Sequence, residues 1–165
     1  DNIFDIGGIT AKCRTLRQHK SVDLIVVDYL QLVGSKGSRN ANRAIEVGEY
    51  SRALKMLAMQ LGCPVLLLSQ LNRNVETRPD KRPLMADLRE SGSVEQDANK
   101  IVMLYRDEVY NEQTTEQGVA ELIVRKHRGG KIGTVRAAGH LRWFTFSDLA
   151  FTSQQTGAAN YDPFN

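Results

Sequence analysis

The sequence of 165 residues predicts an α/β fold with a mostly parallel sheet that is flanked by helices and followed by a C-terminal β-hairpin. Three short apolar runs, at residues 24–27, 65–68 and 101–104, are typical of strands covered on both faces. A long amphipathic segment separates the first two runs, as in a strand-helix-strand unit. We therefore expect all three runs to be central strands of one parallel sheet.

Two amphipathic helices are expected before the second strand. Thr10 can cap the first helix, in which Ile9, Cys13 and Leu16 share a face. The second helix ends at Gly62, a residue that commonly terminates helices. Its apolar residues recur at intervals of three and four: Val47, Tyr50, Leu54, Leu57, Ala58 and Leu61.

The rest of the chain is predicted to contain loops, a short helix and a hairpin. Residues 34–42 and 71–89 lack an apolar period, and basic side chains outnumber acidic ones in the second of these loops. A short helix is expected at 94–98. Residues 120–124 and 134–138 can pair as a hairpin with a basic tip that contains glycines.

Length and composition suggest one domain over residues 1–150, with a last strand or edge at 141–146, and a polar tail over 151–165. The net charge of +3 is compatible with binding to nucleic acid. No apolar run approaches the roughly 20 residues of a membrane span. Cys13 and Cys63 lack metal-ligand spacing, which favours reduced thiols in a cytosolic protein, and no metal cage of side chains is expected.

A polar residue follows each of the first two predicted strands, Asp28 after the first and Gln70 after the second. In open α/β sheets, ligands bind at the carboxyl ends of the strands. A carboxylate in this position can hold Mg²⁺ through its water shell, and an amide can sense whether a γ-phosphate is present. On these residues alone, each could equally be the polar start of a loop.

A phosphate-binding loop of the form G-x-x-x-x-G-K-[ST] does not occur in the sequence. Residues 129–134 contain the right residue types in a different order, inside the predicted hairpin. In folds of this kind the phosphate loop follows a strand that precedes the acid-bearing strand, and this chain begins without Met. We therefore expect a chain that is truncated at its N-terminus and does not hydrolyse ATP alone.

Four segments resemble the C-terminal half of the motor domain in the DnaB family of bacterial and phage replicative DNA helicases: LIVVDYLQLV, LLLSQLNRNVETRPDKRPLMADLRESGSVEQDA, IVMLYRDEVY and ELIVRKHRGGKIGTV. They follow the family's order. The resemblance implies a RecA-like P-loop NTPase core and an ATP- and Mg²⁺-dependent helicase that forms homo-hexameric rings. It also implies 5′→3′ translocation on single-stranded DNA, a cytoplasmic and nucleoid-associated location, and a primase and a helicase loader as partners.

The same resemblance implies roles for individual residues. Asp28 matches the Walker B acid, and Gln70 matches the γ-phosphate sensor. Lys126 and Arg128 match the basic pair that reaches a neighbouring subunit's nucleotide; the family usually has Lys-Gln-Arg-Asn-Gly here, and this chain has Lys-His-Arg-Gly-Gly. The loop that holds the DNA backbone is matched by Arg89, Glu90 and Gly92. The family's P-loop residues, catalytic Glu, linker helix and N-terminal collar have no match in this sequence.

Two other classes of protein remain to be weighed. Another RecA-like ATPase, of the recombinase or clock type, would have a similar acid and glutamine, but DLRESGSVEQDA and the Lys-x-Arg hairpin argue against it. A non-catalytic nucleic-acid-binding module would use the basic loop at 73–89 and need no nucleotide. A phosphate loop upstream in the reading frame would distinguish the helicase from the binding module.

Overall fold

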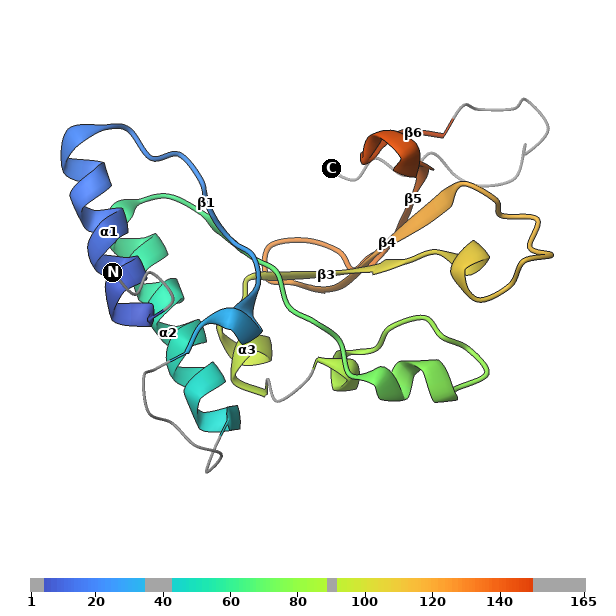
Figure 1. Cartoon of the computed structure of the whole chain (residues 1–165), viewed down its shortest axis with the longest axis horizontal. Helices are drawn as coiled ribbons and strands as arrows, with labels where there is room; N and C mark the ends of the chain where they lie inside the picture. Colours follow the sequence, from blue (N-terminus) through green and yellow to red (C-terminus); the bar gives the residue numbers. More distant parts are fainter. Residues whose placement is uncertain (1–4, 35–42, 89–91, 150–165) are drawn as a thin grey trace. The chain divides into compact units, whose positions relative to one another are not determined.

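The computed structural model describes three stretches of the chain: residues 5–34, 43–88 and 92–149 (Figure 1). They fall into two compact units. Unit 1 comprises the chain up to Thr77 together with 84–98, and unit 2 comprises 78–83 together with the chain from Asn99 onward. No helix in these stretches has the length and apolar composition that a membrane span requires.

Unit 1 contains the predicted strand-helix-strand motif. Its regular elements are α1 (Ile6–His19), β1 (Ile25–Val27), α2 (Arg43–Leu61), β2 (Val65–Leu67) and α3 (Gly92–Asp97), with short 3₁₀ helices at Leu30–Leu32, Arg73–Thr77 and Met85–Asp87. β1 and β2 pair in parallel, with Ile25 opposite Val65 and Val27 opposite Leu67 (Figure 1). The first two predicted strands and the helix between them are therefore confirmed.

The core of unit 1 lies between the two long helices and one face of the β1–β2 pair. Ile25 and Val27 are buried on this face, and Ile9 of α1 packs against the same cluster. On the opposite face Val26 and Leu66 are exposed. Coverage on both faces was expected, but within the described residues these two strands are covered on one face only.

α2 matches its predicted apolar pattern. Val47, Tyr50, Leu54 and Leu57 are all buried. The helix ends as expected at Gly62, whose φ of 63° lies in the left-handed region that glycine adopts without strain. The Cys63 N–H then donates to the carbonyl of Ala58 at 3.2 Å, the long bond of a Schellman motif.

α1 begins earlier than predicted, and Thr10 does not cap it. The helix starts at Ile6 after Asp5, and the Thr10 hydroxyl donates to the carbonyl of Gly7 at 2.9 Å, inside the helix. A threonine hydroxyl can bond back to a preceding carbonyl as readily as it can cap, so its presence does not fix a helix start. Ile9 and Cys13 pack against the core as expected, whereas Leu16 is exposed.

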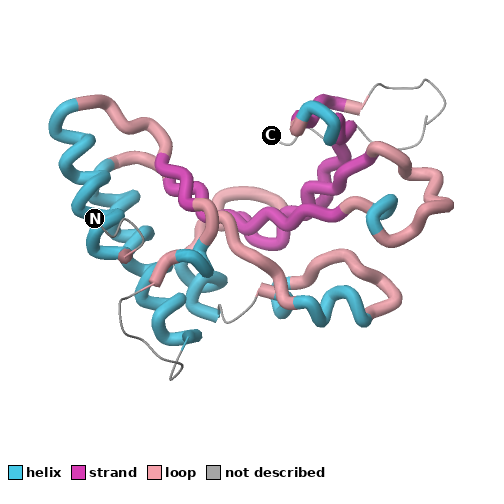
Figure 2. The backbone as a smooth tube through the Cα atoms, in the orientation of Figure 1, coloured by secondary structure: helices cyan, strands magenta, loops and turns pink. Residues whose placement is uncertain are grey.

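Unit 2 is built on an antiparallel sheet with the strand order β3-β4-β5-β6. Figure 2 draws the strands in magenta. The strands are β3 (Lys100–Tyr105), β4 (Val119–His127), β5 (Gly133–His140) and β6 (Thr145–Asp148), with 3₁₀ helices at Asp107–Val109 and Leu141–Trp143. The predicted hairpin is confirmed, because Ala120 pairs with Ala137 and Val124 with Gly133. The last strand is shorter than predicted, since 141–143 form a 3₁₀ helix.

The prediction that residues 101–104 form a central parallel strand is wrong. β3 pairs antiparallel with β4 and is the end strand of the four-stranded sheet. Buried Ile101 and Met103 alternate with exposed Val102 and Leu104, which is the pattern of a strand with one covered face. An apolar run does not by itself distinguish this arrangement from a strand buried on both faces.

The surface at the end of this sheet carries exposed aromatic side chains. Trp143 is 72% exposed, and the guanidinium carbon of Arg142 lies 5.7 Å from the centre of its ring. Phe144 follows with a φ of 51° and is also exposed.

Candidate functional site

Asp28 follows β1 directly, and its side chain is exposed. The backbone on both sides of it is fixed to the neighbouring strand. The Leu68 N–H donates to the carbonyl of Val27 at 3.0 Å, and the N–H of fully buried Leu30 donates to the carbonyl of Leu68 at 2.9 Å. The peptide bond between Asp28 and Tyr29 is cis. The carboxylate is therefore presented to solvent from a well-anchored turn.

Gln70 follows β2, and its side chain is exposed. The side-chain amide of Gln31 holds its backbone: the Gln70 N–H donates to Gln31 Oε1 at 3.2 Å, and Gln31 Nε2 donates to the Gln70 carbonyl at 3.4 Å. The same Gln31 nitrogen donates to Ser69 Oγ at 3.1 Å. One side chain thus ties the chain that leaves β1 to the chain that leaves β2.

Asp28 and Gln70 consequently lie at the same edge of the strand pair. β1 and β2 are parallel and in register, so the residues that follow them leave at the carboxyl edge. This edge is the usual place for a ligand in an open α/β sheet. The structure brings these two predicted site residues together, and their chemical roles remain predictions.

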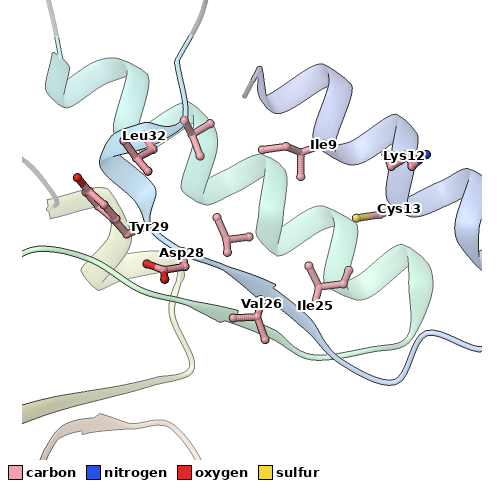
Figure 3. A pocket seen from close by; sticks show the side chains of 10 residues that line it. Ile9, Lys12, Cys13, Ile25, Val26, Asp28, Tyr29 and Leu32 are labelled. Atoms are coloured by element: carbon pink, nitrogen blue, oxygen red, sulfur yellow. The ribbon is translucent and has the colours of Figure 1, made fainter. Parts of the chain in front are cut away.

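A hollow of about 300 Å³ lies beside Asp28, between α1 and the end of β1 (Figure 3). Tyr29 also lines it, and α1 contributes Lys12 and Cys13. Most of its other lining residues are apolar: Ile9, Ile25, Val26, Val27, Leu32 and Val33. A polyphosphate needs several N–H or cationic donors, so this hollow suits an apolar group better than a phosphate chain.

Cys13, on the wall of this hollow, is a free thiol and is partly buried. Burial, with a smaller contribution from nearby Cys63, raises the pKa of the Cys13 thiol above its ordinary value. The thiolate, which is the reactive form, is therefore disfavoured near neutral pH. We assign Cys13 a packing role.

Asp28 is the residue of this edge that could hold a metal. In the stretches that the structure describes, no three His, Cys, Asp or Glu side chains come close enough to form a cage. A single exposed carboxylate fits Mg²⁺, which keeps several waters and is usually bound through one or two carboxylates and substrate phosphates. It does not fit zinc, which takes three or four protein ligands.

Of the three residues predicted to hold DNA, Arg89 and Glu90 lie outside the described residues. Gly92 is the exposed first residue of α3. That helix is fixed to α2 by a hydrogen bond of 2.8 Å from Ser51 Oγ to Asp97 Oδ2. Gly92, the described residue of the predicted DNA-binding segment, thus begins a helix that is hydrogen-bonded to α2.

Lys126 and Arg128 lie at the end of β4 and just beyond it. Lys126 is half-buried and pairs with Ile101 of β3. A bulge adds Arg125 to β4 at this point, because Val124 pairs with Val102. Arg128 is exposed, and its N–H donates to the carbonyl of Asn99 at 3.0 Å. The predicted basic pair is thus carried by a strand end that is bonded to the start of β3.

His127, between the two cations, contacts the hairpin tip. Its Nδ1 lies 3.4 Å from the carbonyl oxygen of Lys131. A Cβ added at Gly130 would lie 2.4 Å from His127 Cε1, a distance at which one of them has to move. The ring therefore packs over a position that only glycine fills without displacement.

Sequence reasoning missed two groups of residues. Gln31 is the first. It stands three residues after Asp28, and a side-chain amide close to the end of an apolar strand is a signal that could have identified it. Arg82 is the other: its Nε and Nη2 donate to the two carboxylate oxygens of Glu121 at 2.8 and 2.7 Å. No spacing rule links residues so far apart in the sequence, so only the folded chain reveals this pair.

Residues 2–148 match the family described as DnaB-like helicase C terminal domain. The replicative DNA helicase DnaB of Pasteurella multocida is 53% identical over 137 residues, which are 83% of this chain and 29% of that protein. The replicative DNA helicase DnaB of Geobacillus stearothermophilus is 50% identical over 133 residues, 81% of this chain and 29% of that protein. The chain thus spans less than a third of the length of these relatives.

A solved structure agrees with the sequence comparisons. It is described as that of a DnaB-like replicative helicase and its interactions with primase, and it matches with a TM-score of 0.82 at 38% identity, covering 88% of this chain and 35% of that one. The predicted α/β, RecA-like fold class is confirmed by this likeness. The chain belongs to the DnaB-like helicase C-terminal domain family.

Proposed function

We propose that this chain is part of the motor of an ATP-dependent replicative DNA helicase that translocates 5′→3′ on single-stranded DNA and unwinds the duplex at the replication fork. The observation that carries the proposal is the position of Asp28 and Gln70 after adjacent parallel strands, with Gln31 holding the backbone of Gln70. A motor of this kind needs a metal-holding acid and a phosphate sensor that converge on one nucleotide. The relatives' names, replicative DNA helicases, support the same conclusion.

In this proposal Asp28 holds Mg²⁺ through water, and the Gln70 amide hydrogen-bonds the γ-phosphate of ATP and a nearby water. Magnesium, when bound, neutralises charge that develops on the transferred phosphoryl group. Asp28 needs the exposed and anchored position that it has, because it must reach a hydrated ion without moving. Gln70 can report the loss of the γ-phosphate only if its backbone is fixed, which is what Gln31 provides.

Lys126 and Arg128 are proposed to act on the nucleotide of a neighbouring subunit in a homo-hexamer. Lys126 lies near the end of β4 and Arg128 in the turn that follows, so both cations stand at one strand end and can meet one anion. Such an anion reduces their mutual repulsion. Positive charge delivered to a phosphate in the transition state lowers the barrier to hydrolysis.

Arg89, Glu90 and Gly92 are proposed to hold the backbone of single-stranded DNA. Contacts to phosphates carry no base information, so they suit a motor that moves along any sequence. We also propose a primase and a helicase loader as partners and a location in the cytoplasm beside the nucleoid. The primase is supported by the description of the related helicase structure.

The test mixes two variants of the complete helicase. Arg128→Ala subunits keep Asp28, and Asp28→Asn subunits keep Arg128. If Arg128 acts across the subunit interface, each variant alone is inactive. A ring interface joins unlike faces of neighbouring subunits, so each site takes Asp28 from one subunit and Arg128 from the next. In a random one-to-one mixture, about one site in four then receives both intact residues. ATP turnover of the mixed rings should therefore rise clearly above the sum of the separate variants.

Two controls accompany this mixture. A double variant with Asp28→Asn and Arg128→Ala, mixed with Arg128→Ala, should give no recovery. Lys131→Ala, which removes an exposed cation from the same hairpin tip, should retain turnover. A mixture no more active than its separate components would contradict the action of Arg128 on a neighbour.

A further inference from the structure

β4 contains a bulge directly before the predicted basic pair. Val124 pairs with Val102 of β3. Two residues later, Lys126 pairs with Ile101, which is next to Val102. Arg125 is therefore an extra residue without a counterpart in β3. Because the side chains of a strand alternate between its two faces, one extra residue decides which face the following side chains take.

The bulge sets the positions of both cations. It places Lys126 opposite Ile101, which is buried. Without the extra residue, Lys126 would stand on the other face, opposite exposed Lys100, and the two like charges would repel each other. The same register brings the Arg128 N–H to the carbonyl of Asn99 at 3.0 Å. The places of Lys126 and Arg128 therefore depend on the extra residue before them.

The side chain of Arg125 holds this bulge through one hydrogen bond. Its Nε donates to the carbonyl of Pro83 at 3.0 Å, and Pro83 is buried. Both residues belong to unit 2, in which residues 78–83 pack with the antiparallel sheet. A buried carbonyl that loses its donor costs free energy. The bond therefore favours the register in which Arg125 is the extra residue.

The acceptor of this bond is itself fixed to β4. Nε and Nη2 of Arg82, the residue before Pro83, donate to the two carboxylate oxygens of Glu121 at 2.8 and 2.7 Å. This paired geometry is the one in which a guanidinium matches a carboxylate best. The guanidinium carbon of Arg82 also lies 4.7 Å from the ring centre of Tyr105 in β3. Pro83 is thus tied to the strand that carries Arg125, four residues before the bulge.

We propose that Arg125 is a positioning residue for the basic pair, because its bond to Pro83 holds the bulge that places Lys126 and Arg128. Arg125 acts through these two residues, and a donor at the position of its Nε is sufficient. The inference rests on the proposed function, in which the pair acts on the nucleotide of a neighbouring subunit. A displaced pair then lowers kcat, whereas the KM for ATP changes little, because Asp28 and Gln70 are untouched.

The test compares three substitutions of Arg125 in the complete helicase. The amide nitrogen of glutamine is as many bonds from the backbone as Nε of arginine, so Arg125→Gln keeps the donor and removes the charge. Arg125→Met puts a methyl carbon in this place and removes both. Arg125→Lys keeps the charge and moves the donor one bond outward.

Arg125→Met should lower kcat for ATP about tenfold with little change in KM, the effect expected when one hydrogen bond of a charged group is lost. Arg125→Gln should keep kcat within about threefold of the wild type, and Arg125→Lys should lie between the two. Arg136→Met, which removes a guanidinium paired with Glu116 on the neighbouring strand, should behave as the wild type. Thermal unfolding of every variant measures any general loss of stability.

Mixed rings test whether the effect reaches a neighbour. Asp28→Asn subunits keep the bulge and the basic pair. When they are mixed one to one with Arg125→Met subunits, ATP turnover should exceed the sum of the separate components several-fold, because some Arg125→Met sites then receive an intact pair. A defect confined to the subunit that carries Arg125→Met would give no such recovery.

Three results would overturn the positioning role while Arg128→Ala remains inactive. The first is full kcat in Arg125→Met. The second is a kcat in Arg125→Gln as low as in Arg125→Met, since the charge would then be what matters. The third is a loss in step with a lower melting temperature and without recovery in mixed rings.

Two further outcomes are also decisive. If Arg125→Met does not fold, a higher kcat in Arg125→Gln than in Arg125→Lys supports the proposal, and the reverse order overturns it. Full turnover in Arg128→Ala would remove the proposed action on a neighbour and the positioning role together.

Discussion

The side-chain amide of Gln31 bonds to both backbone polar groups of Gln70, accepting from its N–H at 3.2 Å and donating to its carbonyl at 3.4 Å. Gln31 leaves β1 and Gln70 leaves β2, so the position of the proposed sensor is set by the neighbouring strand. A sensor must be fixed in the absence of its ligand, because a residue that is free to move responds weakly to one lost hydrogen bond.

We predict that Gln31→Ala in the complete helicase lowers kcat for ATP by about tenfold, because Gln70 loses the two bonds that hold its backbone. The KM for ATP and the melting temperature should change little. Steady-state ATPase assays check this, with Gln113→Ala in an exposed loop as the control. An unchanged kcat would show that Gln70 is positioned by something other than Gln31.

We predict that Asp28→Asn lowers ATP turnover by at least about a hundredfold with little loss of stability, because the amide keeps the shape of the side chain without its charge. Asp23→Asn is the matched control, since Asp23 is an exposed acid just before β1 rather than after it. Turnover and circular dichroism are measured for both variants. Turnover within a few-fold of the wild type would exclude Asp28 as the metal acid.

We predict different outcomes for the two adjacent glycines of the hairpin tip. Gly130→Ala should lower the free energy of unfolding by about 0.5–1.5 kcal/mol, because its Cβ would displace the His127 ring, the end of a partly exposed side chain. Gly129→Ala should be nearly neutral, since nothing lies within 4 Å of a Cβ there. Urea unfolding followed by circular dichroism compares them. Equal effects would mean that the His127 ring turns aside without cost.

We predict that Glu108 contributes to the acid sensitivity of unit 2. The Gly118 N–H bond at 2.8 Å, and then the pair with Arg106, lower the pKa of the Glu108 carboxyl below its ordinary 4.5. A carboxyl whose pKa is lower in the folded state stabilises the fold above about 4.5, and this stabilisation is lost as the pH falls through that value toward the folded-state pKa.

Glu108→Gln should therefore flatten the fall in unfolding free energy below about pH 4.5, since the amide does not titrate. Urea unfolding at a series of pH values measures the slope. Glu112→Gln, at an exposed acid in the following loop, should leave the slope unchanged. The same slope in wild type and Glu108→Gln would mean that other carboxyls carry the acid effect.

Patterns in short stretches of sequence predicted those parts of the fold that depend on neighbouring residues, such as a helix or the end of a strand. The repeat from Val47 to Leu61 predicted α2 because burial of one helical face requires that spacing. Asp28 and Gln70 were predicted as site residues because each ends an apolar strand. The partner of β3 was not predicted, since Ile101 to Tyr105 alternate in burial although nearly all are apolar, and pairing depends on chain far away in the sequence.

The ion pair of Arg82 with Glu121 could not be predicted from the sequence, for a different reason. The chain has 22 basic and 19 acidic residues, and nothing in their order indicates which two will meet across 39 positions. Likewise, the bulge at Arg125 comes from a register shift that the alternation of β4 does not reveal. Contacts of this type are set by the tertiary fold.

Trp143 gives the chain an unusual optical property. It is the single tryptophan, and its ring is 72% exposed in the folded state. Indole emission shifts to longer wavelength when water surrounds the ring, so unfolding the core would change the emission of this protein very little. A partner or subunit that covered Trp143 would instead shift the emission to shorter wavelength. The emission wavelength of Trp143 should therefore respond to association at the end of the antiparallel sheet and should change little when the chain unfolds.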